Sequence, residues 1–159
     1  MPGYFVDTSA LAKLYHQERG SDYVERILNE RSSKGIISRL SLVEFESVLA
    51  IKIRTGVLDP AGRTIALRRF RADIAGNRII VGPPIEEKHF QSATRLLRTH
   101  AVDRGLRTLD GIQLAVALDL RQAGVDLCVS LVGSAAMRGG RALWMSGGRS
   151  SESWIGSIS

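Results

Sequence analysis

Four short apolar runs that alternate with helix-like segments constrain this chain more than any other feature. The runs lie at residues 4–6, 36–38, 78–81 and 127–130, and most segments between them repeat apolar residues every three or four positions. The runs are typical of buried strands, and the repeats of amphipathic helices. Because strands that alternate with helices form parallel sheets, the sequence predicts an α/β fold with helices packed on a central parallel sheet.

Polar residues that favour helix N-termini mark where the predicted helices begin. Asp7, Ser41 and Thr108 each precede or open a helical repeat, and Asp59 is followed by Pro60. Side-chain oxygens at such positions accept hydrogen bonds from free backbone N–H groups, and proline fits the first helical turn. The predicted helices extend from Asp7 to about residue 16, then over residues 22–31, 41–55, from residue 60 onward, 85–102 and 109–122.

The composition predicts a soluble protein. The chain has 159 residues, of which 44% are hydrophobic, and no apolar run approaches the roughly 20 residues of a membrane helix. The N-terminus lacks the basic and apolar segments of a secretory signal, so we expect a cytoplasmic location and no membrane partner. The single cysteine, Cys128, lies in an apolar run and is interpreted as a buried thiol.

The last part of the chain differs from the rest. From residue 133 to residue 159, 13 of 27 residues are Gly or Ser. So few apolar residues cannot offset the conformational entropy that is lost on ordering. We therefore predict one domain over residues 1–131 and a partly flexible Gly/Ser-rich segment over residues 132–159, with one further strand possible at residues 142–145.

Basic residues outnumber acidic ones, 22 to 16, for a net charge of +6. Most of the bases are arginine, whose planar guanidinium suits phosphate, so an anionic partner such as nucleic acid is expected. Arg68, Arg69 and Arg71 lie on the polar side of a predicted helix and are candidates for RNA binding. An arginine-rich source genome, or an ordinary solvated helix face, would give the same pattern.

Three acids occupy comparable places in the predicted fold. Asp7, Glu44 and Asp110 each lie at or within the first turn of a predicted helix. The starts of helices that follow parallel strands gather on one edge of the sheet, so these carboxylates are candidates to converge. Converging carboxylates repel one another and normally persist only around divalent cations such as Mg²⁺ or Mn²⁺.

Each of these acids also has a simpler explanation. Asp7 can serve as an N-cap, and Glu44 can complete a Ser-x-x-Glu capping box with Ser41. Asp110 can complement the dipole of its helix from the first turn. Spacing alone does not separate these roles from a metal site.

Five segments carry motif-like residues in a fixed order along the chain. They are Asp7-Thr8-Ser9-Ala10-Leu11, Glu18-Arg19-Gly20-Ser21, Ser41-Leu42-Val43-Glu44-Phe45 with Gly56-Val57-Leu58 after its helix, and Leu109-Asp110-Gly111-Ile112-Gln113-Leu114-Ala115. Together they resemble a PIN domain and, more narrowly, the VapC-type toxins of toxin–antitoxin pairs. The similarity extends over residues 3–131, and the ordered set is more specific than any one segment.

The resemblance implies a Mg²⁺- or Mn²⁺-dependent endoribonuclease toxin with a three-layer α/β/α fold and a central parallel sheet of four to five strands. Asp7, Glu44 and Asp110 match the catalytic, metal-binding acids of the family, and Ser9 matches a supporting hydroxyl. Cleavage of RNA would leave a 5′-phosphate and a 3′-hydroxyl. The implied partners are an RNA substrate, a second copy of the chain in a homodimer, and a cognate VapB-type antitoxin.

The chain departs from the PIN pattern after its last predicted parallel strand. The family usually carries a fourth acid there, but Val132 occupies that position. The departure coincides with the Gly/Ser-rich segment, which suggests a replaced or frame-shifted C-terminus. We therefore predict that divalent metal binding is retained and that RNA cleavage is weak or absent.

Two other functions remain open from the sequence. In the first, the chain is a non-catalytic PIN-like module that binds RNA or an antitoxin through its arginines. In the second, it is a DNA-directed 5′ nuclease, although it lacks the extra length of such enzymes. Metal-dependent cleavage of an RNA panel separates the enzyme from the binding module.

Overall fold

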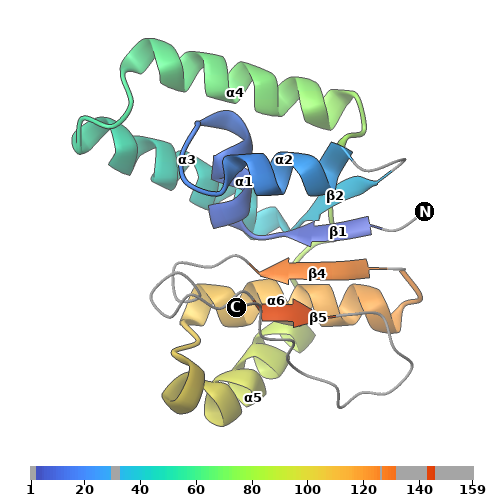
Figure 1. Ribbon diagram of the computed structural model, residues 1–159. Helices are drawn as coiled ribbons and strands as arrows, with labels where there is room; N and C mark the ends of the chain where they lie inside the picture. Colours follow the sequence, from blue (N-terminus) through green and yellow to red (C-terminus); the bar gives the residue numbers. More distant parts are fainter. Residues whose placement is uncertain (1–2, 30–32, 126, 132–142, 146–159) are drawn as a thin grey trace.

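The computed structural model describes residues 3–29, 33–125, 127–131 and 143–145. Its helices and strands alternate along the chain as the sequence predicts (Figure 1). In chain order they are β1 (Gly3–Val6), α1 (Thr8–Tyr15), α2 (Ser21–Asn29), β2 (Lys34–Ile37), α3 (Arg39–Arg54), α4 (Pro60–Ala75), β3 (Ile79–Val81), α5 (Glu87–Arg104), α6 (Thr108–Gln122), β4 (Leu127–Leu131) and β5 (Leu143–Met145).

The strands form one sheet in the order β3-β2-β1-β4-β5. The first four are parallel to one another, and β5 pairs antiparallel with β4. The α/β class is confirmed, but the parallel part of the sheet ends at β4. Residues 132–142 separate these two strands and leave little room for the helical crossover that a further parallel strand needs. From β1 the chain adds β2 and then β3 on one side of the sheet. It then returns to add β4 on the other side of β1.

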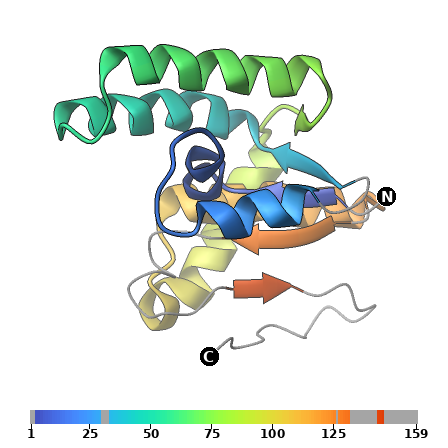
Figure 2. The ribbon, with the colours of Figure 1, turned by 45° about the horizontal axis from the view of Figure 1, so that its top comes forward.

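Side chains that alternate along the strands divide the core between the two faces of the sheet. Val6 and Ile37 belong to a cluster with α1, α2, α3 and α4, whereas Phe5 and Ile36 belong to a cluster with α6. This alternation follows from the two-residue period of a strand. Figures 1 and 2 show the resulting layers, with α1 to α4 on one side of the sheet and α5 and α6 on the other.

Helices α3 and α4 lie side by side as an antiparallel pair in Figures 1 and 2. Three aromatic rings join this pair to α1. The ring centroid of Phe45 lies 5.6 Å from that of Tyr15 and 4.7 Å from that of Phe70. Phe45 is fully buried. Because Glu44 immediately precedes Phe45, this packing also fixes the part of α3 that carries the acid.

Most predicted element boundaries lie within a few residues of those observed. Asp59 caps α4, where its carboxylate accepts a hydrogen bond from the backbone N–H of Gly62. The predicted caps Ser41 and Thr108 are wrong, because α3 and α6 begin earlier, after Ser38 and Arg107. Some predictions concern residues that lie outside the described part of the chain. They are the end of the second helix, Val132, and the Gly/Ser-rich segment except residues 143–145.

The helices that the structure describes include none that is long and apolar enough to cross a membrane.

Candidate active site

Asp7 lies at the carboxyl end of β1, where the strand passes directly into α1. It is the N-cap of α1, and its Oδ1 accepts a hydrogen bond of 2.8 Å from the backbone N–H of Ala10. The N-cap interpretation is therefore confirmed. Asp7 is also buried, with only 4% of its surface exposed. Aspartate is rarely buried unless it is paired with another group, so capping alone does not explain a carboxylate at this depth.

The surroundings of Asp7 disfavour its negative charge. Burial raises the pKa of Asp7 to about 7, and repulsion from Asp110 and Glu44 contributes to the rise. The hydrogen bond from Ala10 and the charge of Lys13 oppose it. Since both other acids act on Asp7, the carboxylates of Asp7, of Glu44 in α3 and of Asp110 in α6 lie near the same edge of the sheet.

Glu44 lies in the second turn of α3, not in the first. The N-cap of α3 is Ser38, whose hydroxyl accepts a hydrogen bond from the backbone N–H of Ser41. The predicted capping box between Ser41 and Glu44 is thus wrong. The Glu44 carboxylate instead points toward α1, where its Oε2 accepts a hydrogen bond of 2.7 Å from the hydroxyl of Thr8.

Asp110 lies in the first turn of α6, as predicted. Its carboxylate accepts a hydrogen bond from the backbone N–H of Arg107, the N-cap residue. Burial raises the pKa of Asp110, while this hydrogen bond and the charge of Arg107 act in the opposite direction. Asp110 therefore stabilises the start of its helix and also contributes negative charge near Asp7.

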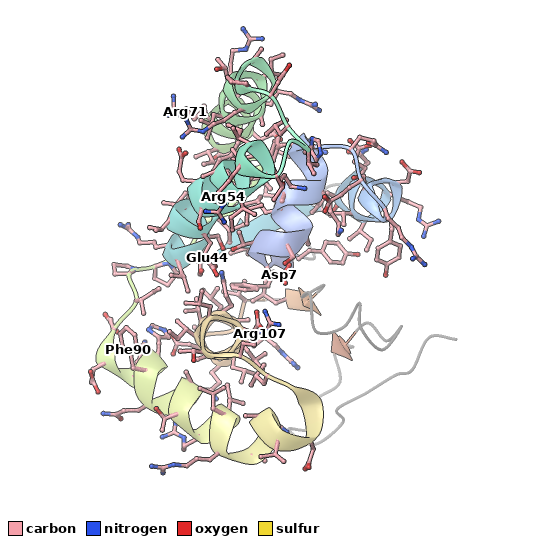
Figure 3. All side chains as sticks on the ribbon, turned by 90° about the vertical axis from the view of Figure 1, so that its left-hand side faces the viewer. Asp7, Glu44, Arg54, Arg71, Phe90 and Arg107 are labelled. Carbon is pink, nitrogen blue, oxygen red and sulfur yellow. The ribbon has the colours of Figure 1, made fainter. Side chains whose placement is uncertain are left out.

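Figure 3 faces the edge of the sheet at which the parallel strands end. Asp7 and Glu44 lie together near its centre, and Arg107 lies on the α6 side of them. Arg71 lies far from this group, on α4. The edge therefore combines an acidic centre with a nearby arginine, an arrangement that suits both a cation and a phosphate.

The three acids do not close into a complete ligand set. Among the described residues, no group of three Asp, Glu, His or Cys side chains is arranged to hold a metal ion. Each carboxylate accepts a hydrogen bond from a different protein donor: Ala10 for Asp7, Thr8 for Glu44 and Arg107 for Asp110.

The chemistry of the donors nevertheless fits Mg²⁺ or Mn²⁺. Both are hard cations that prefer carboxylate oxygens, and Mg²⁺ usually keeps several waters while it uses one or two protein carboxylates. The positive charge of Lys13 is the smallest of the effects on the pKa of Asp7, and it does not offset burial and the two like-charged neighbours. Asp7, together with Asp110 or Glu44, would hold such an ion, and a third protein ligand is not required.

Other predicted site residues are less involved than the acids. Ser9 is half-buried, and its hydroxyl has no hydrogen bond within the described part of the chain. Arg68, Arg69 and Arg71 are exposed on α4, and none forms an ion pair with a described acid. His89 is a packing residue, because its buried ring contacts the Glu86 backbone and Asp119.

The structure adds residues that sequence reasoning missed. Thr8 and Gln113 both contact Glu44, and Arg107 lies next to Asp110. Gln113 follows Asp110 by three residues, which places both on one side of α6. This spacing was the available signal, but a glutamine inside a helix has no distinctive pattern by itself.

A family model for the PIN domain matches residues 4–126. The match covers β1 through α6, which includes all three acids. The chain therefore belongs to the PIN domain family, whose fold is nuclease-like. No curated protein matches the sequence.

Proposed function

We propose that this protein is a divalent-metal-dependent endoribonuclease of the toxin type, with its site at Asp7, Glu44 and Asp110. The observation that carries the proposal is the buried Asp7 carboxylate, whose charge is opposed by the two other acids at the same edge. A protein that only needed an N-cap there would gain nothing from such repulsion. A cation at this edge would remove the repulsion.

The proposed reaction is the hydrolysis of an RNA phosphodiester. A bound Mg²⁺ or Mn²⁺ would lower the pKa of a water molecule and neutralise charge on the phosphate. Asp7 would hold the ion when its carboxylate is ionised. Arg107, at the N-terminus of α6, would attract the phosphate group, because a guanidinium can donate two parallel hydrogen bonds to its oxygens.

Cleavage by this chain is expected to be weak. The acids of the described part do not form a three-ligand group. In the sequence, the position of the fourth family acid carries Val132. Incubation of the full chain with a panel of single-stranded RNAs, with and without Mn²⁺, tests the proposal. Slow, Mn²⁺-dependent cleavage that leaves 5′-phosphates supports it, and cleavage that is unaffected by a chelator contradicts it.

The second candidate is a non-catalytic PIN module that binds RNA or an antitoxin. The open arrangement of the acids favours it. This candidate predicts RNA binding without cleavage at any Mn²⁺ concentration. A homodimer and a cognate VapB-type antitoxin are proposed as partners in either case, because both follow from the resemblance to VapC-type toxins.

We expect the exposed arginines of α4 to contribute to RNA affinity. In Arg68→Gln/Arg71→Gln, two cations on successive turns of α4 are lost. Each phosphate contact to a single strand contributes about 0.7 to the slope of log affinity against log salt, so the slope should fall by about 1.4. Fluorescence anisotropy at several salt concentrations measures this slope.

The matched control is Arg95→Gln/Arg98→Gln, which has the same spacing on α5, on the other side of the sheet. We expect the control to leave the slope unchanged. Equal slopes for the two double variants would mean that α4 is an ordinary solvated helix face. The contribution of Arg69 is tested by adding Arg69→Gln to the α4 variant.

A further inference from the structure

Gln113 lies at the centre of a buried polar network beneath Glu44. It is in α6, and 2% of its surface is exposed. Its side-chain nitrogen donates to Glu44 Oε2 at 2.6 Å and to Ser41 Oγ at 2.9 Å. Its side-chain oxygen accepts a hydrogen bond of 2.6 Å from the hydroxyl of Ser38. The amide thereby joins α6 to the start of α3.

Both N–H donors of this amide are used. An amide NH₂ group has two hydrogens, and the contacts to Glu44 and Ser41 account for both. Thr8 Oγ1 lies farther from the same nitrogen, at 3.2 Å, and its own hydroxyl donates to Glu44. Buried amides are costly unless they are hydrogen-bonded, so the satisfied network holds Gln113 in one orientation.

Two donors therefore meet on a single oxygen of Glu44. Oε2 accepts hydrogen bonds from Thr8 in α1 and from Gln113 in α6. Among the described residues, no donor contacts Oε1 of Glu44. With Oε2 held from two sides, rotation of the carboxylate is restricted, and Oε1 is the oxygen left for another ligand.

We propose that Gln113 is a positioning residue that orients the Glu44 carboxylate so that its Oε1 can serve the divalent cation at Asp7. This inference rests on the proposed function, since it requires a cation at this edge. Gln113 acts through Glu44 and has no contact with the cation itself. The alternative is that Gln113 only fills space between α3 and α6, in which case its volume matters and its N–H donors do not.

Gln113→Met separates these two roles, because methionine keeps most of the volume and removes the donors. Outer-shell residues that orient a metal ligand typically change metal affinity by about 10- to 100-fold when they are replaced. We expect a loss of Mn²⁺ affinity in that range, measured by calorimetric titration of the full chain. The control is Leu114→Ala, a buried neighbour in α6 that packs with Phe5 and should leave Mn²⁺ affinity unchanged.

A double-variant cycle tests whether Gln113 acts through Glu44. If it does, Gln113→Met should cause no further loss of Mn²⁺ affinity in an E44Q background, since the two changes remove one interaction. Additive losses would overturn the proposal. Thr8→Val removes the other donor to the same oxygen and should weaken Mn²⁺ binding in the same direction, and this variant replaces Gln113→Met if the latter does not fold.

The outcomes for the inference and for the proposed function are distinct. If the wild-type chain binds Mn²⁺ and Gln113→Met binds it equally well, the positioning role is wrong and the metal site stands. If the wild-type chain does not bind Mn²⁺, both are wrong. Weaker binding by Gln113→Met and Thr8→Val, with unchanged binding by Leu114→Ala, supports both.

Discussion

Replacing Asp7 with asparagine should stabilise the metal-free protein and remove most of its affinity for divalent cations. Asparagine is as good an N-cap as aspartate, so the hydrogen bond from Ala10 is retained. The substitution removes a buried charge that is repelled by Asp110 and Glu44. At functional sites, side chains that the function needs often lower the stability of the fold. A gain in stability together with a loss of metal affinity in Asp7→Asn would fit this trade-off.

The pH dependence of this gain follows from the pKa of Asp7. The folded-state pKa is raised from 3.8 to about 7, so between these values the folded protein binds a proton that the unfolded chain releases. The free energy of unfolding of the wild type therefore falls as pH rises from about 4 to 7. An asparagine side chain does not titrate, so the advantage of Asp7→Asn grows over this range and is constant above it.

We expect Asp7→Asn to gain about 2–4 kcal/mol at pH 8 in the presence of a chelator, and little at pH 4. Urea unfolding at both pH values measures the difference. Asp59→Asn is the matched control, because Asp59 is an exposed N-cap that accepts an equivalent hydrogen bond from Gly62. It should change stability by less than about 1 kcal/mol. Equal effects of the two substitutions would contradict the burial and repulsion at Asp7.

Replacing Phe45 with alanine should have the largest effect on stability. Phe45 is fully buried and packs its ring against Tyr15 and Phe70. Removing a buried phenylalanine ring costs about 3–5 kcal/mol, because transfer free energy is lost and a cavity remains. The loss should loosen α3 against α1 and α4. Glu44 would then be less well fixed beside Thr8.

Phe90→Ala provides the comparison for this prediction, since Phe90 on α5 is 47% exposed (Figure 3). We expect it to cost less than about 1 kcal/mol. Thermal or urea unfolding of both variants gives the comparison. A Phe45→Ala variant no less stable than Phe90→Ala would mean that the aromatic cluster does not support the α3–α4 pair.

The fold was predictable because its signals are local. Short apolar runs give β1, β2, β3 and β4 in the correct order, and the apolar spacing gives the helices. Helix starts were less certain, since several hydroxyl residues compete for one N-cap. The apolar pattern extends the second strand to Ser38, although this residue caps α3. The predicted start of α3 is therefore too late. As a result, Glu44 was predicted in the first turn and in a capping box, whereas it lies in the second turn.

The candidate site was predictable only in part, because it depends on contacts between distant segments. The order of the motifs along the chain selects Asp7, Glu44 and Asp110 as candidates, and their role stays a prediction. The depth of Asp7 and the separate donors of the three carboxylates depend on how α1, α3 and α6 pack, which no local pattern reports. Gln113 was missed for the same reason, since its partners lie 69 to 105 residues away in sequence.

Calorimetric titration of Mn²⁺ into the full chain at pH 8 tests the central claim most directly. At this pH Asp7 is mostly ionised, because its pKa is about 7. We predict saturable binding by the wild type and by Asp59→Asn, and binding at least about 100-fold weaker by Asp7→Asn. Absence of binding by the wild type, or equal affinity in Asp7→Asn, would contradict the assignment of this acidic edge as a metal site.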